Sequence, residues 1–184
     1  FISALAFIST SLGVAVLIIV SSVMNGFEQE LKDRVLNVIP HASIYGLNPI
    51  DDWKSVEINL RDDTNLRGIS PYIETEALIK SKSAVAGVLV NGVIASKDKS
   101  VSVIHEFMQT GNFEKIQTSN NIVLGRLLAR KLNVDVGDKI SLMLPDTSSS
   151  FAGYFPRSKV FNISGIFNIG SKDIDETLAY ISLE

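Results

Sequence analysis

The first 27 residues of this chain contain no charged side chain, and the first one that follows is Glu28. A helix of about 20 apolar residues is long enough to cross the hydrocarbon core of a bilayer. The run accounts for much of the 46% hydrophobic content of the 184-residue chain, because the remainder has the mixed composition of an ordinary globular protein. We therefore expect a transmembrane helix over residues 1–27 and a globular domain after it.

Two other structures share this apolar composition: a signal peptide and the buried core helix of a soluble protein. A signal peptide begins with basic residues and has a shorter apolar core, whereas no Lys or Arg precedes this run. Its small residues, such as Gly13 and Ala15, are typical of packed membrane helices. The absence of an initiator methionine predicts that the natural N-terminus lies before Phe1. The membrane span is therefore the preferred interpretation.

Beyond the apolar run, the sequence predicts that the same helix continues out of the membrane. Hydrophobic residues recur at Phe27, Leu31, Val35 and Val38, with charged residues between them. This spacing is typical of an amphipathic helix. Pro40 ends the pattern, because the residue before a proline avoids the helical region. We expect a stalk that reaches residue 39.

The rest of the chain alternates between short strand and helix patterns. Asp51 and Asp52 can cap a helix that runs to about Leu60, and Gly137 supplies the backbone freedom for a tight turn. Helices are expected near residues 51–60, 98–107 and 125–132. Strands are expected at residues 42–46, 69–73, 76–81, 84–94, 121–124, 139–144, 160–167 and 178–183. About seven or eight strands and three helices, without an internal repeat, predict an α+β fold.

One long stretch, residues 145–159, has no strand or helix pattern and connects two strands that would pair through a much shorter turn. Loops of this length inside a compact domain are usually functional or disordered. Three consecutive serines favour disorder, whereas Phe151, Tyr154 and Phe155 favour a surface that binds a partner. Both interpretations stay open on the residues alone, and partner binding is preferred.

Charge and composition argue against several functions. The net charge is −3, and the 17 basic and 20 acidic residues are mixed along the chain. We therefore predict no nucleic acid partner, because phosphate binding needs a basic stripe. The chain has no cysteine and only two histidines, His41 and His105. Disulfides, thiolate metal sites and a histidine-rich metal site are accordingly not expected.

Motifs for catalysis are missing from the sequence. No glycine-rich loop of the Walker type is present, so the chain should not hydrolyse ATP itself. Asp173, Asp175 and Glu176 could form a cation or acid–base site, but the order of ligands in a calcium loop does not follow them. We interpret these three residues as a solvated acidic loop. The sequence predicts no catalytic residue, no metal ion and no cofactor, and thus no enzyme.

The end of the apolar run carries a more specific motif. Its sequence is SVMNGFEQEL at residues 22–31, followed by Arg34 and by IPH at residues 39–41. This segment resembles the signature at the end of the first membrane helix in the LolC/LolE permease family of lipoprotein-releasing ABC transporters. Further matches are GVA at 13–15, PYI at 71–73, IVLG at 122–125, LNV at 132–134 and VGD at 136–138. The last three resemble the core of MacB-like periplasmic domains.

The resemblance implies a subunit of the bacterial inner membrane whose globular domain lies in the periplasm. Residues 28–70 would form the first half of a membrane-proximal Porter subdomain, and residues 71–184 would form a Sabre subdomain. The second Porter half and further membrane helices would follow residue 184. Such a transporter extracts outer-membrane lipoproteins from the inner membrane with ATP hydrolysed by a separate LolD subunit. It then passes them to the periplasmic carrier LolA.

The resemblance also implies partners and sites. A second permease subunit would complete a LolC/LolE heterodimer or a LolF homodimer, in contact with membrane lipids. The loop at residues 145–159 resembles the LolA-binding Hook of LolC-like and LolF-like members, although PYI at 71–73 looks more like LolE. The implied LolA-binding residues are Phe151, Tyr154, Phe155, Pro156, Arg157, Ser158 and Lys159. The expected cavity for lipoprotein acyl chains is lined by Val16, Ile19, Val20, Val23, Met24 and Phe27.

Two alternative functions stay open at this point. A MacB-like efflux or mechanotransmission permease shares the same periplasmic core. A membrane-anchored periplasmic scaffold would lack the further membrane helices. The motif around Met24 and Phe27 favours lipoprotein release.

Overall fold

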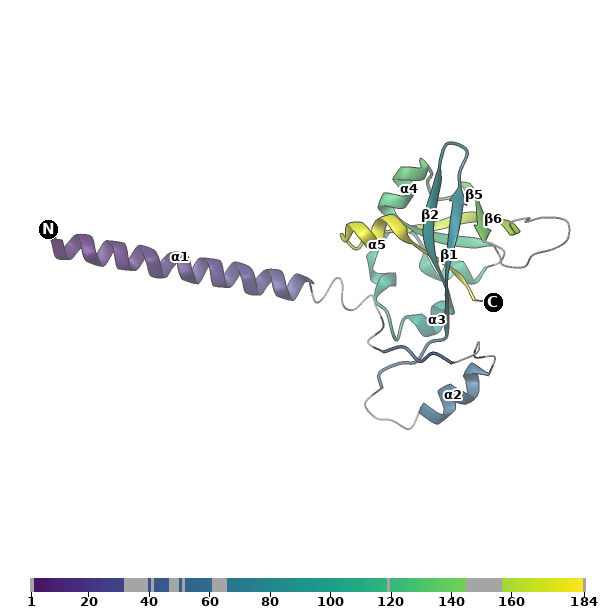
Figure 1. Cartoon of the computed structure of the whole chain (residues 1–184), viewed down its shortest axis with the longest axis horizontal. Coiled ribbons are helices and arrows are strands. Elements are labelled where there is room, and N and C mark those ends of the chain that lie inside the picture. Colours follow the sequence, from purple (N-terminus) through teal and green to yellow (C-terminus); the bar gives the residue numbers. More distant parts are fainter. Residues whose placement is uncertain are drawn as a thin grey trace.

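The computed structural model describes residues 2–31, 40, 42–46, 50, 52–60, 66–118, 120–144 and 157–183. A long helix at the N-terminal end is followed by a short segment around a second helix and then by a strand-rich domain (Figure 1). The apolar helix and the α+β domain match the predicted fold class. The segment predicted as a stalk, residues 32–39, lies outside the described residues.

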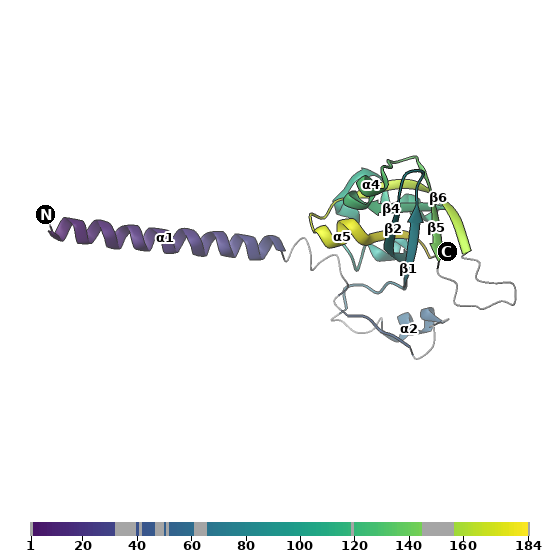
Figure 2. The ribbon, with the colours of Figure 1, turned by 45° about the horizontal axis from the view of Figure 1, so that its top comes forward.

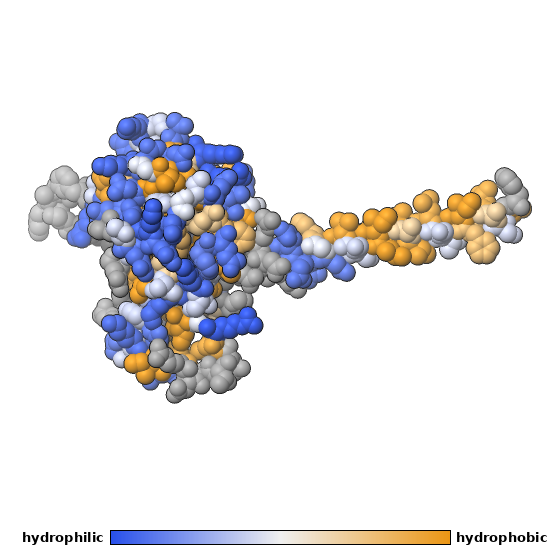
Figure 3. Space-filling model, turned by 180° about the vertical axis from the view of Figure 1, so that it is seen from behind, coloured by the Kyte–Doolittle hydropathy of each residue, from blue (hydrophilic) through white to orange (hydrophobic). Residues whose placement is uncertain are grey.

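Helix α1, Ile2–Leu31, contains 30 residues and is therefore about 45 Å long. It is long and apolar enough to cross a bilayer, and none of its most apolar window is buried inside the protein. Apolar side chains cover most of its visible face (Figure 3). A water-soluble protein would bury such a surface, so the core-helix alternative does not apply to α1.

The domain after residue 70 is built on seven strands. They are β1 Tyr72–Lys80, β2 Val85–Val93, β3 Met108–Gly111, β4 Asn121–Gly125, β5 Lys139–Leu144, β6 Arg157–Phe167 and β7 Leu178–Ser182. The order across the sheet is β3-β6-β4-β7-β2-β1-β5, and β5 also pairs with β6. Six strands therefore close into a barrel, and β3 adds to β6 next to β5.

Closure depends on the length of β6. Its first half pairs antiparallel with β5, from Leu144↔Arg157 to Lys139↔Asn162. Its second half runs parallel to β4 and antiparallel to β3, with register shifts in both pairings. These shifts let one strand of 11 residues change neighbours along its length.

Alternating side chains fill the barrel, as they do in other small barrels. The inner core contains side chains from all six strands, including Ile79, Val90, Ile122, Leu142 and Ile163. Helix α4, Arg126–Leu132, packs Leu128, Ala129 and Leu132 against the same core and closes one end. Gly137 turns the chain after α4 with a φ of 97°, as predicted.

A second core covers the outside of the barrel over β4, β6 and β7. It contains Val123, Phe167 and Tyr180 from these strands, together with residues of three short helices. The short helices are α3 Ala95–Asp98, η2 Ile104–Phe107 and η3 Phe113–Gln117. The sequence predicted a helical turn or two near residues 98–107 but missed η3 and β3.

The segment before the barrel contains helix α2, Trp53–Leu60, which is capped as predicted: Asp52 Oδ1 accepts a hydrogen bond of 3.2 Å from the Ser55 backbone amide. The strand predicted at residues 42–46 is wrong, because this stretch has no regular secondary structure. Instead, the Tyr45 hydroxyl hydrogen-bonds the hydroxyl of Tyr72 at 2.5 Å. This contact connects the segment to the start of β1.

The prediction of a solvated acidic loop at Asp173, Asp175 and Glu176 is also wrong. These residues lie in helix α5, Lys172–Thr177, and Asp175 is 1% exposed. Its two carboxylate oxygens accept hydrogen bonds of 2.9 Å from the backbone amides of Ile169 and Gly170. Glu176 pairs with Lys131 of α4 at 2.8 Å. The acidic residues therefore hold α5 in place.

Candidate functional site at the barrel mouth

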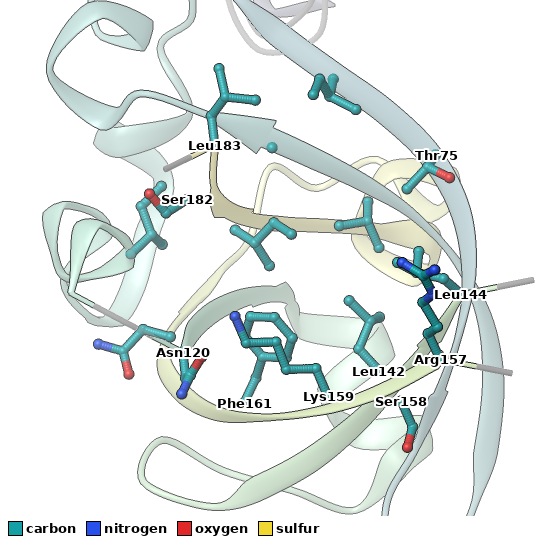
Figure 4. A pocket seen from close by; sticks show the side chains of 16 residues that line it. Thr75, Asn120, Leu142, Leu144, Arg157, Ser158, Lys159, Phe161, Ser182 and Leu183 are labelled. Carbon is teal, nitrogen blue, oxygen red and sulfur yellow. The ribbon is translucent and has the colours of Figure 1, made fainter. Parts of the chain in front are cut away.

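The end of the barrel opposite α4 is hollow. A cavity of about 450 Å³ lies there, lined by inward-facing residues of β1, β2, β5, β6 and β7 (Figure 4). Strands β2, β5 and β7 end at this cavity, whereas β1 and β6 begin there. In Figure 2 the C-terminal end of the chain lies near the ends of β5 and β6. We call this opening the barrel mouth.

The floor of the barrel mouth is apolar. Val90, Leu142 and Phe161 are 1%, 3% and 6% exposed, and they are the last layer of the inner core. The rim contains Ile73 and Leu144, both exposed. An apolar hollow at the open end of a small barrel is a common location for a ligand site.

Two cations stand on one side of the barrel mouth. Arg157, Lys159 and Phe161 alternate along β6 and therefore face the same side of the strand. The Lys159 ammonium lies 5.4 Å from the centre of the Phe161 ring, within the range of a cation–π contact. Positive charge is thus placed directly above the apolar floor.

The partner-binding loop predicted at residues 145–159 meets the barrel at this mouth. Leu144 and Arg157 pair directly at the ends of β5 and β6. Arg157, Ser158 and Lys159 belong to β6 rather than to the loop, so the predicted boundary is three residues too long. The other predicted LolA-binding residues, Phe151, Tyr154, Phe155 and Pro156, lie outside the described residues.

The predicted acyl-chain residues are brought together on α1. Their spacing of three and four residues places them along one face of the helix, and every side chain is more than half exposed. The residues are Val16, Ile19, Val20, Val23, Met24 and Phe27. The predicted acyl-chain residues lie on α1, whereas the described residues of the predicted LolA-binding set lie on β6 at the barrel mouth. The two predicted sets therefore belong to two separate surfaces.

The second core, outside the barrel, contains two buried polar residues that the sequence did not predict, Asp98 and Tyr180. Asp98 is 7% exposed, and its Oδ2 has no hydrogen-bond partner among the described residues. Burial raises the pKa of Asp98 to about 6. Tyr180 is 3% exposed, and its burial, together with the nearby Asp98 carboxylate, raises the pKa of its phenol. Among the described residues, no group of three His, Asp or Glu side chains is arranged to hold a metal ion.

Comparison with known proteins agrees with this architecture. The profile of the MacB-like periplasmic core domain matches residues 3–184. The chain belongs to this family. The MacB-like core domain described here also resembles the extracellular domain of YknZ, a noncanonic ABC-type transporter from Gram-positive bacteria. The TM-score is 0.50 at 10% identity, over 73% of this chain and 64% of that domain, so this likeness concerns the fold alone.

Curated relatives of the MacB-like core domain carry LolC and LolE names. The chain is 34% identical over 186 residues to the lipoprotein-releasing system transmembrane protein LolC of Xylella fastidiosa, across its full length and 45% of that protein. It is 34% identical to LolC of Neisseria meningitidis over 189 residues and 33% identical to LolE of Haemophilus influenzae over 181 residues. These matches confirm the resemblance to the LolC/LolE family. The chain spans less than half the length of these relatives.

Proposed function

We propose that this chain is the first membrane helix and the periplasmic domain of a permease subunit that releases lipoproteins from the bacterial inner membrane. The observation that carries the proposal is the similarity to LolC over the whole chain, including both the apolar helix and the barrel. ATP hydrolysis would take place in a separate LolD subunit. The partner permease would be a second LolC-like, LolE-like or LolF-like chain.

We also propose a division of the chain into two subdomains. Residues 28–70 would belong to a Porter subdomain next to the membrane, and residues 71–184 to a Sabre subdomain. Two features support this boundary. The barrel begins at Tyr72 and has its own inner core. Helix α2 contacts it through a local pair, in which the Lys97 ammonium lies 2.5 Å from Glu57 Oε1 and 4.9 Å from the centre of the Trp53 ring.

We further propose that the loop between β5 and β6 binds the carrier LolA. Its sequence provides aromatic side chains at Phe151, Tyr154 and Phe155, which can fill apolar pockets of a partner. Arg157 and Lys159 stand where the loop joins the barrel, and Ser158 lies between them. Cations at this position would attract carboxylates of the carrier and increase the rate of encounter.

The exposed face of α1 is the proposed contact for acyl chains. A hydrocarbon chain needs a wide apolar surface with few directional contacts, which Val20, Val23 and Phe27 provide. Met24 adds an unbranched, adaptable side chain. The simpler possibility is that this face meets bilayer lipid or neighbouring helices.

The test is lipoprotein release from proteoliposomes that contain the full-length protein with its partner permease and ATPase. We expect ATP-dependent transfer of a lipoprotein to soluble LolA. Replacing Tyr154, Phe155 and Pro156 together by Ser should abolish transfer and LolA pull-down without changing the melting temperature. Met24→Glu should block release but leave the complex assembled. A normal rate of transfer in the Met24→Glu complex would exclude the α1 face as the acyl contact.

The family also supports a second candidate, a MacB-like efflux or mechanotransmission permease, because its profile covers the same residues. The same proteoliposomes distinguish the two functions. ATP hydrolysis without lipoprotein transfer to LolA would favour efflux over lipoprotein release. A protein that neither assembles with an ATPase nor transfers lipoprotein would instead be a membrane-anchored scaffold.

A further inference from the structure

The barrel mouth has the properties of a small-molecule site that carrier docking by the loop does not require. Its volume of about 450 Å³ lies within the roughly 300–1,000 Å³ of typical ligand pockets. Its deepest side chains, Val90, Leu142 and Phe161, belong to the inner core of the barrel and yet line an accessible cavity. A ligand that entered would therefore contact core side chains directly.

The walls of the barrel mouth select an apolar ligand. Strand alternation directs Ile73, Val90, Leu142 and Ile181 inward from four different strands. Such a surface gives dispersion contacts and desolvation but almost no directional hydrogen bonds. The lining also contains Thr75, Asn120, Asn121, Ser158 and Ser182, but most of its surface is apolar. An unbranched hydrocarbon chain therefore fits it better than a sugar or a nucleotide, which would lose many hydrogen bonds with water.

The cations at the rim of the barrel mouth favour a ligand that carries a negative charge. Arg157 and Lys159 face the cavity from β6 (Figure 4), and the described residues that line it include no Asp or Glu. The ammonium of Lys159 lies above the ring of Phe161, at the boundary between the apolar floor and water. An anionic group at the outer end of a hydrocarbon chain would meet both cations there.

We propose that the barrel mouth binds the end of a single hydrocarbon chain whose outer end carries a negative charge, as in a fatty acid anion. The tail contacts the floor at Val90, Leu142 and Phe161. The anionic group pairs with Lys159 and Arg157. This proposal concerns binding by the barrel alone and does not depend on lipoprotein release.

The experiment uses the full chain in lipid nanodiscs and a palmitate analogue with a diazirine at its last carbon. After illumination, the cross-linked residues are mapped by mass spectrometry. We expect cross-links in the peptides that contain Val90, Leu142 or Phe161, in addition to those in α1. The methyl ester of the same probe should label α1 equally but the barrel mouth about three- to tenfold less, because one or two partly exposed ion pairs are lost.

Two pairs of variants distinguish binding of the probe in the barrel mouth from its non-specific partitioning into the protein. Thr75→Trp fills the mouth and should abolish barrel labelling, whereas Glu74→Trp, on the outer face of β1, should leave it intact. The double variant Arg157→Gln and Lys159→Gln should reduce labelling by the acid to that by the ester. The matched control is the double variant Lys80→Gln and Lys82→Gln, which removes two positive charges at the β1–β2 end of the barrel. It should leave labelling of the barrel mouth by the acid unchanged.

Three results would overturn the proposal: labelling of α1 alone, equal labelling of the barrel mouth by acid and ester, or full labelling of Thr75→Trp. The last two would mean that the probe reaches the barrel by non-specific partitioning. Neither LolA nor ATP is present in this assay. A negative result therefore leaves the proposed lipoprotein release standing, and a failure of release leaves this binding site standing.

Discussion

At the scale of single residues, Asp98 makes the stability of the barrel depend on pH. Burial raises its pKa from an ordinary 3.8 to about 6, so the folded state binds a proton more tightly than the unfolded state does. The contribution of Asp98 to the free energy of unfolding is therefore fully present below about pH 4 and is lost as pH rises to about 6. The difference between a pKa of 3.8 and one of about 6 corresponds to roughly 3 kcal/mol in the free energy of unfolding.

Replacing Asp98 by Asn removes the charge and keeps the shape. We expect Asp98→Asn to be more stable than the parent protein at pH 8 by about 1–3 kcal/mol, and the difference to vanish near pH 4. The measurement is urea unfolding of the chain in detergent micelles at several pH values, followed by the near-ultraviolet circular dichroism of the barrel tyrosines. If the free energy of unfolding of the variant changed between pH 4 and 6 as steeply as that of the parent protein, a group other than Asp98 would be responsible for the pH dependence.

Asp175 is also buried, but both oxygens of its carboxylate accept hydrogen bonds, from the backbone amides of Ile169 and Gly170. Asp175→Ala leaves the buried N–H of Ile169 and the partly buried N–H of Gly170 without their acceptor, and we expect a loss of about 2–3 kcal/mol in the free energy of unfolding. Asp173→Ala, in the same helix but exposed, is the matched control and should change stability by about 0.5 kcal/mol or less. Equal effects of the two substitutions in urea unfolding would contradict this role.

At the scale of elements, α2 and the barrel are connected through Lys97. Its ammonium pairs with Glu57 and lies over the Trp53 ring, and Trp53 is the single tryptophan of the chain. We expect Lys97→Ala to weaken the docking of α2 by about 1 kcal/mol and to shift the tryptophan emission to longer wavelength, while urea unfolding of the barrel is unchanged.

Lys99→Ala is the control for this prediction. Lys99 pairs with Glu114 of η3, and this contact lies within the domain after residue 70. The substitution should leave the emission of Trp53 unchanged. An equal spectral shift in both variants would mean that the emission reports a general loosening of the domain rather than the release of α2.

The elements that the sequence predicted are those whose signals are local. Strands β2, β4 and β5 carry alternating or continuous apolar patterns of their own, and α4 has its leucines at helical spacing. The strands expected at 69–73 and 76–81 are instead one continuous strand, β1, because every residue from Tyr72 to Lys80 pairs with β2. Strand β3 has no such pattern, because its place depends on pairing with Ile166 and Phe167, more than 50 residues later. The buried Asp175 was missed for a similar reason, since its partners depend on the fold around α5.

The candidate site was predicted in part. Alternation from Arg157 to Phe161 could have shown that β6 begins earlier than expected, and that two cations share a face with the aromatic floor. The barrel mouth itself could not be predicted. Its residues come from strands that are distant in the sequence, and the closing contacts β1–β5 and β5–β6 are properties of the whole barrel.

At the scale of the whole molecule, the chain enters and leaves the barrel on either side of β2. Tyr72 and Ser182 both pair with Val93, so the two connections are separated by two strand spacings, or about 10 Å. If residues beyond Glu184 return to a membrane-proximal subdomain, as proposed above, these two attachments would act as a hinge, and rotation of the barrel about the line between them would be its least restrained motion. The β5–β6 connection leaves from the same end, so a partner that pulls on it acts on a short lever arm. Because the ring of strands is closed, such a pull would turn the barrel as a unit before it could peel one strand from another.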